Sequence, residues 1–225
     1  MGEAVGNVLP LAVAVAVFPI PIIAMVVIVG SERGRAKGFA FVLAWFIGLV
    51  AVGAVAITLA KALDASDSGE PATWVAVVLL LLGALLVWLA VKQWLGRPRP
   101  GEETPVPGWM RKVDDFGTGK TALAGFTLSA LNPKNVLLVA AAGLEIAEFG
   151  LPRDQQILAL FVFVVLASAG VLTPLALSVV LGERSGELLE RIRGWMAQNN
   201  AVIMTVLLLL IGAKLIGNAI TAFSG

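Results

Sequence analysis

The sequence predicts an all-α, polytopic membrane protein with six transmembrane helices in two inverted three-helix repeats. Of its 225 residues, 59% are hydrophobic and only 14% are charged, whereas an average soluble domain is about half apolar and a quarter charged. The apolar residues are concentrated in six stretches, each close to the roughly 20 residues that a helix needs to cross a bilayer. Prolines interrupt the first stretch of each half. Composition, segment length and internal pattern therefore favour the same fold class.

The six spans follow one another with short connections. In chain order they are expected at residues 8–29, 39–59, 74–95, 122–144, 157–181 and 201–222. Each is apolar on all sides and lacks the alternating polarity of a barrel strand, so helices are the expected spanning structure.

The distribution of Lys and Arg predicts the orientation, because cytoplasmic loops carry an excess of both. Twelve lie in the loops after the first, third and fifth spans, and only Lys61 and Arg153 lie in the other loops. The twelve are Arg33, Arg35, Lys37, Lys92, Arg97, Arg99, Arg111, Lys112, Lys120, Arg184, Arg191 and Arg193. Both termini are therefore expected outside, with the three basic loops in the cytoplasm.

Three units are expected: a first repeat at residues 1–95, a cytoplasmic linker at 96–119 and a second repeat at 120–225. The linker is rich in proline and includes an amphipathic stretch at residues 109–116, which predicts a short interfacial helix. A second amphipathic stretch, at residues 187–196, predicts another interfacial helix before the last span.

The two halves resemble each other in two places. The third span contains L-L-L-L-G-A at Gly83, and the sixth contains L-L-L-L-I-G-A at Gly212. The first span is interrupted by F-P-I-P and the fourth by L-N-P-K-N. Because each half has three spans, the halves lie in opposite senses across the membrane, as in transporters whose discontinuous helices mark the binding site.

The break in the fourth span supplies the leading candidate residues. Pro133 removes a backbone donor in mid-span, and Asn132 and Asn135 flank it, where they can satisfy the freed backbone groups or a ligand. Lys134 lies close to the centre of the span. A charge there costs at least about 2.5 to 3.5 kcal/mol, so Lys134 is expected to face protein or a wet cavity.

Three further residues complete the candidate path. Pro19 and Pro21 interrupt the first span, and Lys214 lies beyond the middle of the sixth. The nearest carboxylates, Glu145 and Glu148, are expected at the outer end of the fourth span, so neither lysine is expected to have an anionic partner. An anionic ligand such as a phosphate, sulfate or carboxylate would then best account for both lysines.

Several classes of function are disfavoured. The chain has no Cys and no His, so no catalytic triad, thiolate chemistry or imidazole metal site can be assembled. No enzyme activity, metal or cofactor is therefore expected. A net charge of +1 gives no indication of nucleic-acid binding.

The sequence resembles the lysine-exporter (LysE) superfamily at P-I-P in the first span and L-N-P-K-N in the fourth. It is most similar to the GAP branch, the sulfolipid-addressing or peptidoglycolipid-exporter proteins. The strings that support this are GSERGRAKGFAF (30–41), PGWMRKVDDF (107–116), LSALNPKNVLLVAAAG (128–143) and IGAKLIGN (211–218).

The resemblance implies a six-span protein of the bacterial inner membrane that moves amphipathic envelope glycolipids outward. The break residues Pro19, Pro21, Asn132, Pro133, Lys134 and Asn135 would then line the path. Amino-acid exporters of the superfamily carry Pro-Gly-Pro where this chain has P-I-P. The missing glycine favours the lipid-export branch.

Three functional hypotheses remain open. The first is an exporter or flippase of an anionic envelope lipid or glycolipid, acting among bilayer lipids, alone or with a larger envelope-lipid export machine. The second is an exporter of a small anionic or zwitterionic metabolite. The third is a non-transporting scaffold for envelope-lipid assembly. Self-association is compatible with each of them.

Overall fold

The computed structural model describes residues 1–64, 73–97 and 115–224, and within these ranges it contains helices and no strand. In chain order the elements are α1 (Gly2–Ala16), α2 (Pro19–Gly30), α3 (Gly34–Asp64), α4 (Thr73–Leu95), α5 (Thr118–Phe126), the π-helix η2 (Thr127–Leu131), α6 (Pro133–Glu148), α7 (Arg153–Ala167), α8 (Ala169–Leu181), the 3-10 helix η3 (Gly182–Ser185) and α9 (Gly186–Ser224). The all-α prediction is confirmed.

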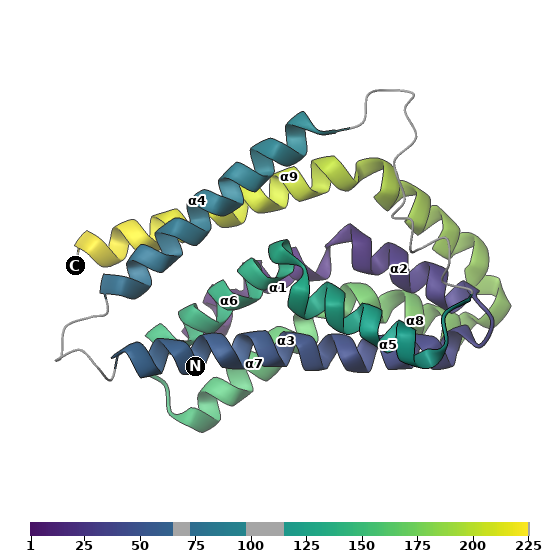
Figure 1. Ribbon diagram of the computed structural model, residues 1–225, viewed down its shortest axis with the longest axis horizontal. Helices are drawn as coiled ribbons and strands as arrows, with labels where there is room; N and C mark the ends of the chain where they lie inside the picture. Colours follow the sequence, from purple (N-terminus) through teal and green to yellow (C-terminus); the bar gives the residue numbers. More distant parts are fainter. Residues whose placement is uncertain (65–72, 98–114, 225) are drawn as a thin grey trace.

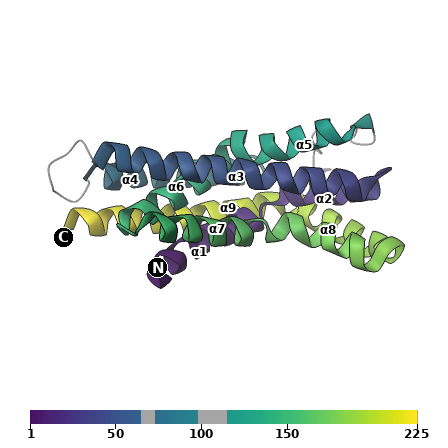
Figure 2. The same ribbon diagram turned by 90° about the horizontal axis from the view of Figure 1, so that it is seen from below.

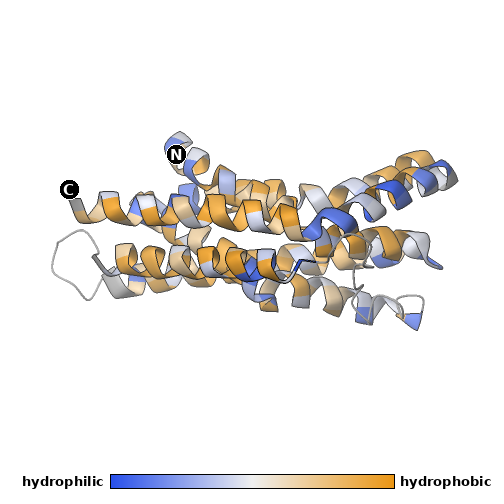
Figure 3. Cartoon of the chain, turned by 90° about the horizontal axis from the view of Figure 1, so that it is seen from above, coloured by the Kyte–Doolittle hydropathy of each residue, from blue (hydrophilic) through white to orange (hydrophobic). Residues whose placement is uncertain are grey.

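Three helices, α3, α4 and α9, are each long and apolar enough to cross a membrane. The bent pairs α1–α2 and α7–α8 raise the number of crossings to as many as five. Many apolar side chains on these helices face outward, among them Phe39, Leu43 and Ile47 on α3, which are 54% to 65% exposed. Monomeric soluble proteins rarely expose such a surface. The chain is therefore a helical membrane protein, and Figure 3 shows the apolar residues extending over most of its helices.

The predicted fourth span is built from three elements. The segment at residues 122–144 is divided into α5, η2 and α6 and lies along α3 in the same direction. Glycines permit the close contact, because a Cβ on Gly125 would lie 2.4 Å from the carbonyl oxygen of Phe41 and one on Gly143 would lie 2.8 Å from that of Gly53. The halves of this broken element are thus fixed against one continuous helix.

The bounds of the other helices agree with the predictions in one case and differ in others. The third span, predicted at 74–95, matches α4, whereas the second, predicted at 39–59, extends on both sides to form α3. The amphipathic helix expected at 109–116 falls largely outside the described residues. The one expected at 187–196 is not a separate helix, because α9 continues from Gly186 through the last span without a break.

The helices α4 and α9 form an antiparallel pair along one edge of the molecule (Figure 1). The two helices meet at Gly83 and Gly212, and the carbonyl oxygen of each lies 2.9 Å from the point where the other would carry a Cβ. Such close contact between backbones is available only to small residues. Figure 2 shows α3 and α5 on one side of the molecule and α7 and α8 on the other.

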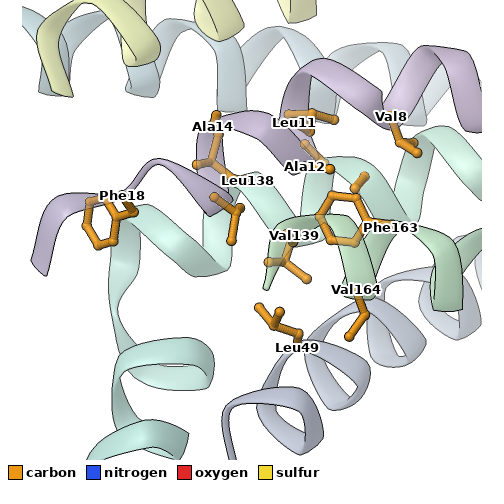
Figure 4. Packing of buried hydrophobic residues seen from close by; sticks show 14 of the residues in the cluster. Val8, Leu11, Ala12, Ala14, Phe18, Leu49, Leu138, Val139, Phe163 and Val164 are labelled. Carbon is orange, nitrogen blue, oxygen red and sulfur yellow. The ribbon is translucent and has the colours of Figure 1, made fainter. Parts of the chain in front are cut away.

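The core lies where α1, α3, α6 and α7 meet (Figure 4). Leu11 of α1, Leu49 of α3, Val139 of α6 and Phe163 of α7 are all fully buried there. These side chains come from both halves of the chain. The core therefore holds the interrupted helices against each other.

A second bent helix was not predicted. The fifth span, expected as one helix at 157–181, bends by 56° between α7 and α8. The Ser168 hydroxyl donates to the Val164 carbonyl at 2.7 Å, and Pro174 lacks the N–H that would bond the Gly170 carbonyl. Gly170 also packs directly on the carbonyl of Ala16 at the end of α1. The bends of α1–α2 and α7–α8 therefore lie against each other.

The contact between α4 and α9 gives a stability prediction. Gly212→Ala is expected to lower the free energy of unfolding by about 1 to 3 kcal/mol, because its Cβ would meet the Gly83 carbonyl at 2.9 Å and a Val87 methyl at 2.7 Å. Gly217→Ala on the same helix has nothing within 4 Å and is the matched control. Thermal unfolding in detergent measures both variants, and equal melting temperatures would contradict the packing described.

Candidate substrate path at the helix breaks

The break between η2 and α6 is capped by its own asparagines. Asn132 precedes α6 with φ −74° and ψ 116°, and its side chain accepts a hydrogen bond from the Lys134 backbone N–H at 3.2 Å. Asn135 is buried, and its amide donates to the Ser129 carbonyl at 2.8 Å. Pro133 occupies the first position of α6, where its missing N–H costs no helical bond. The expectation that these asparagines satisfy freed backbone groups is confirmed.

This break lies at the middle of α3. A Cβ on Gly48 would lie 3.2 Å from the Ala130 side chain and closer still to the Ser129 hydroxyl. Gly48 is near the midpoint of α3, which extends from Gly34 to Asp64. The absence of a side chain at Gly48 thus allows the π-helix to pack against the middle of α3.

Lys134 is the second residue of α6 and is half-buried. Its ammonium donates to the Gln93 side-chain oxygen, near the end of α4, at 2.5 Å. Gln93 is neutral, and none of the ion pairs formed by described residues includes Lys134. Lys134 therefore faces protein, as predicted, but its charge is not neutralised by this contact.

A second cation adds to the positive potential at this site. Lys92, next to Gln93, is close enough to repel Lys134 electrostatically, and its ammonium lies 5.2 Å from the centre of the Trp88 ring. The backbone N–H groups in the first turn of α6 contribute a further partial positive charge. We call Lys92, Gln93, Lys134 and the first turn of α6 the Lys134 site.

The break in the first span has the same local structure as the break at Asn132. Phe18 precedes α2 with φ −59° and ψ 115°, and Pro19 occupies the first turn. Pro19 and Pro21 are buried, as is Phe18, which is 2% exposed. The first-span break is therefore packed with apolar side chains.

Lys214 has an anionic partner, contrary to the sequence prediction. Its ammonium donates to both carboxylate oxygens of Glu145, at 2.6 and 2.8 Å, and the Asn218 amide donates to the same carboxylate at 3.1 Å. The Glu145 side chain is fully buried, and that of Lys214 is 20% exposed. The lysine of α9 is thus neutralised by α6.

The two lysines do not form one site. Glu145 follows Lys134 by eleven residues on α6, which is about 17 Å at 1.5 Å per residue. One signal for the Glu145–Lys214 pair was present in the sequence, since both residues were placed toward the outer side of their spans, the fourth and the sixth. Among the described residues, no group of three or more His, Cys, Asp or Glu side chains is arranged to hold a metal ion.

The buried pair gives a prediction for a double-mutant cycle. Glu145→Leu and Lys214→Met are each expected to cost about 3 to 5 kcal/mol of unfolding free energy, because each leaves an unpaired buried charge. The double variant is expected to be more stable than the sum of the two losses implies, by about 0.5 to 3 kcal/mol. Unfolding in detergent micelles measures all three variants, and strictly additive losses would argue against the pair.

Comparison with known proteins gives one family. No curated protein and no solved structure matches the chain. The model of the SfLAP family, described as Sap, sulfolipid-1-addressing protein, matches residues 8–221. The match covers the α1–α2 and α7–α8 bends, the Lys134 site and the Glu145–Lys214 pair, and therefore nearly the whole fold. The chain belongs to the SfLAP family of sulfolipid-1-addressing proteins.

Proposed function

We propose that this protein carries an anionic amphipathic lipid, of the sulfolipid class, from the inner to the outer leaflet of the bacterial inner membrane. The family description names sulfolipid-1, which fits a substrate with a sulfate-bearing head group and apolar chains. In this proposal the head group crosses through the protein while the chains remain in the bilayer.

The proposal rests on a difference between the two lysines inside the helical bundle, one of which is paired with a carboxylate and the other with a neutral amide. Lys214 is neutralised by the buried Glu145 carboxylate, so it needs no ligand. Among the described residues, the neutral Gln93 is the one hydrogen-bond partner of the Lys134 ammonium, and Lys92 adds like charge beside it. An uncompensated charge is costly in an apolar medium. A sulfate or phosphate that pauses at the Lys134 site offsets this cost.

The chemistry of the site suits such a head group. A lysine ammonium forms charge-assisted hydrogen bonds to sulfate oxygens, and a helix N-terminus favours an anion. The buried Asn135 side-chain oxygen has no hydrogen-bond partner among the described residues. A sugar hydroxyl can donate to such an oxygen. The combination of cation and free acceptor supports a sulfated glycolipid over a bare inorganic anion.

The surroundings of the site favour lateral access. Near the end of α4, the exposed indoles of Trp88 and Trp94 lie beside Lys92 and Gln93 in sequence. Exposed indole rings beside the site offer apolar surface that lipid chains can contact. A lipid that approaches along α4 can therefore keep its chains in the bilayer while its head group reaches Lys134.

Two inverted repeats of three spans, as in the LysE superfamily, form part of the proposal. Phe18 and Asn132 have nearly the same backbone angles before Pro19 and Pro133. Gly83 and Gly212, from the similar Leu-rich strings, contact each other reciprocally, as equivalent residues do at a two-fold axis. Both relationships support halves at residues 1–95 and 120–225.

The middle helix of each proposed half provides an independent parallel. In α3, Gly48 packs on Ala130 of η2, just before the break in the first span of the second half. In α8, Gly170 packs on Ala16, at the end of the first helix of the first half. In each case a glycine in one half packs against the interrupted helix of the other half. The α5–η2–α6 segment then completes six crossings.

The first functional prediction concerns Lys134. In vesicles containing the purified protein and a fluorescent sulfated glycolipid, Lys134→Met is expected to reduce translocation at least tenfold, because the variant cannot hold the sulfate. Lys134→Arg is expected to retain most of the rate. Lys61→Met removes an exposed lysine in the last turn of α3 and is the control for loss of positive charge. Fluorescence quenching from outside measures the translocated fraction.

Three results would count against the proposal. Wild-type translocation by correctly inserted Lys134→Met would remove this lysine from the mechanism. Transport of free sulfate but not of the lipid would favour the small-anion exporter. Normal surface delivery of the lipid in cells that carry Lys134→Met, without any translocation by the purified protein, would favour the scaffold.

The proposed orientation gives a second functional prediction. The chain has no cysteine, so a cysteine introduced at one position provides the one thiol that can be labelled. In intact cells, an impermeant maleimide is expected to label Asp154→Cys, in the first turn of α7, and to leave Arg97→Cys unlabelled until the membrane is opened. Both side chains are exposed. The reverse pattern would contradict termini outside the cell.

A further inference from the structure

An apolar cavity lies where the two bent helices meet the beginning of α9. It has a volume of about 280 Å³ and is partly open to the surface. It is lined by Ala16, Val17, Ile22, Ala169, Gly170, Thr173, Pro174, Ile192 and Met196. We call this space the junction cavity. It is formed by both bends and lies outside the Lys134 site.

The lining of the junction cavity is suited to hydrocarbon. Thr173 is the one lining residue with a polar side chain, and its hydroxyl already donates to the Ala169 carbonyl at 2.8 Å. An ordered water needs two to four polar partners, which such a wall does not offer. For comparison, an apolar cavity of 150 Å³ holds a benzene ring. The junction cavity therefore has room for a length of acyl chain.

The position of the cavity along α9 places it near a membrane surface. Ile192 and Met196 lie on the amphipathic first part of α9, and Trp195 between them is 60% exposed. An exposed tryptophan on such a segment marks the level of the lipid head groups. The cavity thus begins close to the interface and continues to the bends at Val17 and Ser168.

Unpaired positive charge lies near the same end. The side chains of Arg33, Arg35 and Arg184 are exposed, and no ion pair of the described residues includes them. A nitrogen of Arg35 lies 3.6 Å from where Gly182 would carry a Cβ, and Gly182 is about 12 Å along α8 from the cavity residue Pro174.

The other charges in this region largely cancel one another. Arg191 pairs with Glu187 at 2.5 Å and Arg193 with Glu190 at 2.7 Å. In the sequence, Lys37 adds one positive charge to this region, and Glu32 and Glu183 add two negative charges. Together with Arg33, Arg35 and Arg184, the region keeps a net charge of +2, which favours an anion near the cavity.

We infer that the junction cavity binds one acyl chain of an anionic diacyl lipid, with the head group near Arg35 and Arg184. The role of this cavity as the entry position for the transported lipid rests on the proposed function. The lipid would bind here in the inner leaflet before its head group advances to the Lys134 site. The bilayer supplies the chain directly, and the exposed arginines favour an anionic head group over a zwitterionic one.

Photo-crosslinking of the full-length protein tests the binding. The protein is placed in phosphatidylcholine vesicles that contain phosphatidylglycerol with a diazirine at the end of one acyl chain. After irradiation, adducts on peptides covering 169–174 and 192–196 are expected to be at least five times more abundant than adducts around Leu81, a lipid-facing residue of α4 that is 64% exposed. The same diazirine chain on phosphatidylcholine is expected to give at least threefold less labelling of the cavity.

Variants identify the cavity as the cause of the labelling. Thr173→Trp fills the cavity and is expected to lower its labelling at least fivefold. Val180→Trp, on the same helix at a position that is 79% exposed and outside the cavity, is expected to change labelling less than twofold. Arg35→Gln with Arg184→Gln is expected to remove the preference for phosphatidylglycerol. Even labelling of all lipid-facing helices, or undiminished labelling of Thr173→Trp, would overturn the inference.

Translocation measured on the same samples separates this inference from the proposed function. Thr173→Trp is expected to slow the sulfated glycolipid at least fivefold, as an entry position requires. Cavity labelling that survives in Lys134→Met, together with wild-type translocation by that variant, would refute the proposed role of Lys134 while leaving the binding site intact. Loss of labelling in Thr173→Trp with unchanged translocation would overturn the cavity as the entry position.

Discussion

The structure depends on one constraint, which is that a helix interrupted inside a bilayer must satisfy its own polar backbone groups. At the break before α6, Asn132 and Asn135 do so through hydrogen bonds to the Lys134 N–H and the Ser129 carbonyl. At the α7–α8 bend, the Val164 carbonyl accepts hydrogen bonds from both the backbone N–H and the hydroxyl of Ser168. Because these partners are local, the neighbouring helices remain available for close packing through glycine. The interrupted segments are thus stable features that position Lys134.

Much of the fold could be predicted from the sequence because apolar segments of bilayer length have few alternatives to the helix. The break before α6 was also predictable, since a proline flanked by asparagines in mid-span indicates both the interruption and its capping. The bend between α7 and α8 was missed. One of its causes, Pro174, was visible in the sequence as a mid-span proline like those of the first and fourth spans. The other causes are Ser168 and Gly170, which are common in membrane helices, and a contact with Ala16 from the distant first helix.

The candidate site was predicted in part. Lys134 was identified correctly as a cation that faces protein, because its central place in the span made exposure to lipid costly. Its partner Gln93 comes from another helix and could not be deduced without knowing which spans are neighbours. The prediction for Lys214 was wrong for the same reason. The depth of Glu145 was judged from sequence position alone, whereas α6 buries this carboxylate against α9.

The unbroken course of α9 has a mechanical consequence. One continuous helix, curved in its first part (Figure 1), extends from the amphipathic turns at Gly186 to Ser224 and carries the wall of the junction cavity, the Gly212 contact and Lys214 along its length. The close contact with α4 at Gly212 fixes the later part of this helix. Lys214 lies within one turn of that contact, so its pairing with Glu145 is held in place independently of the cavity wall at Ile192 and Met196.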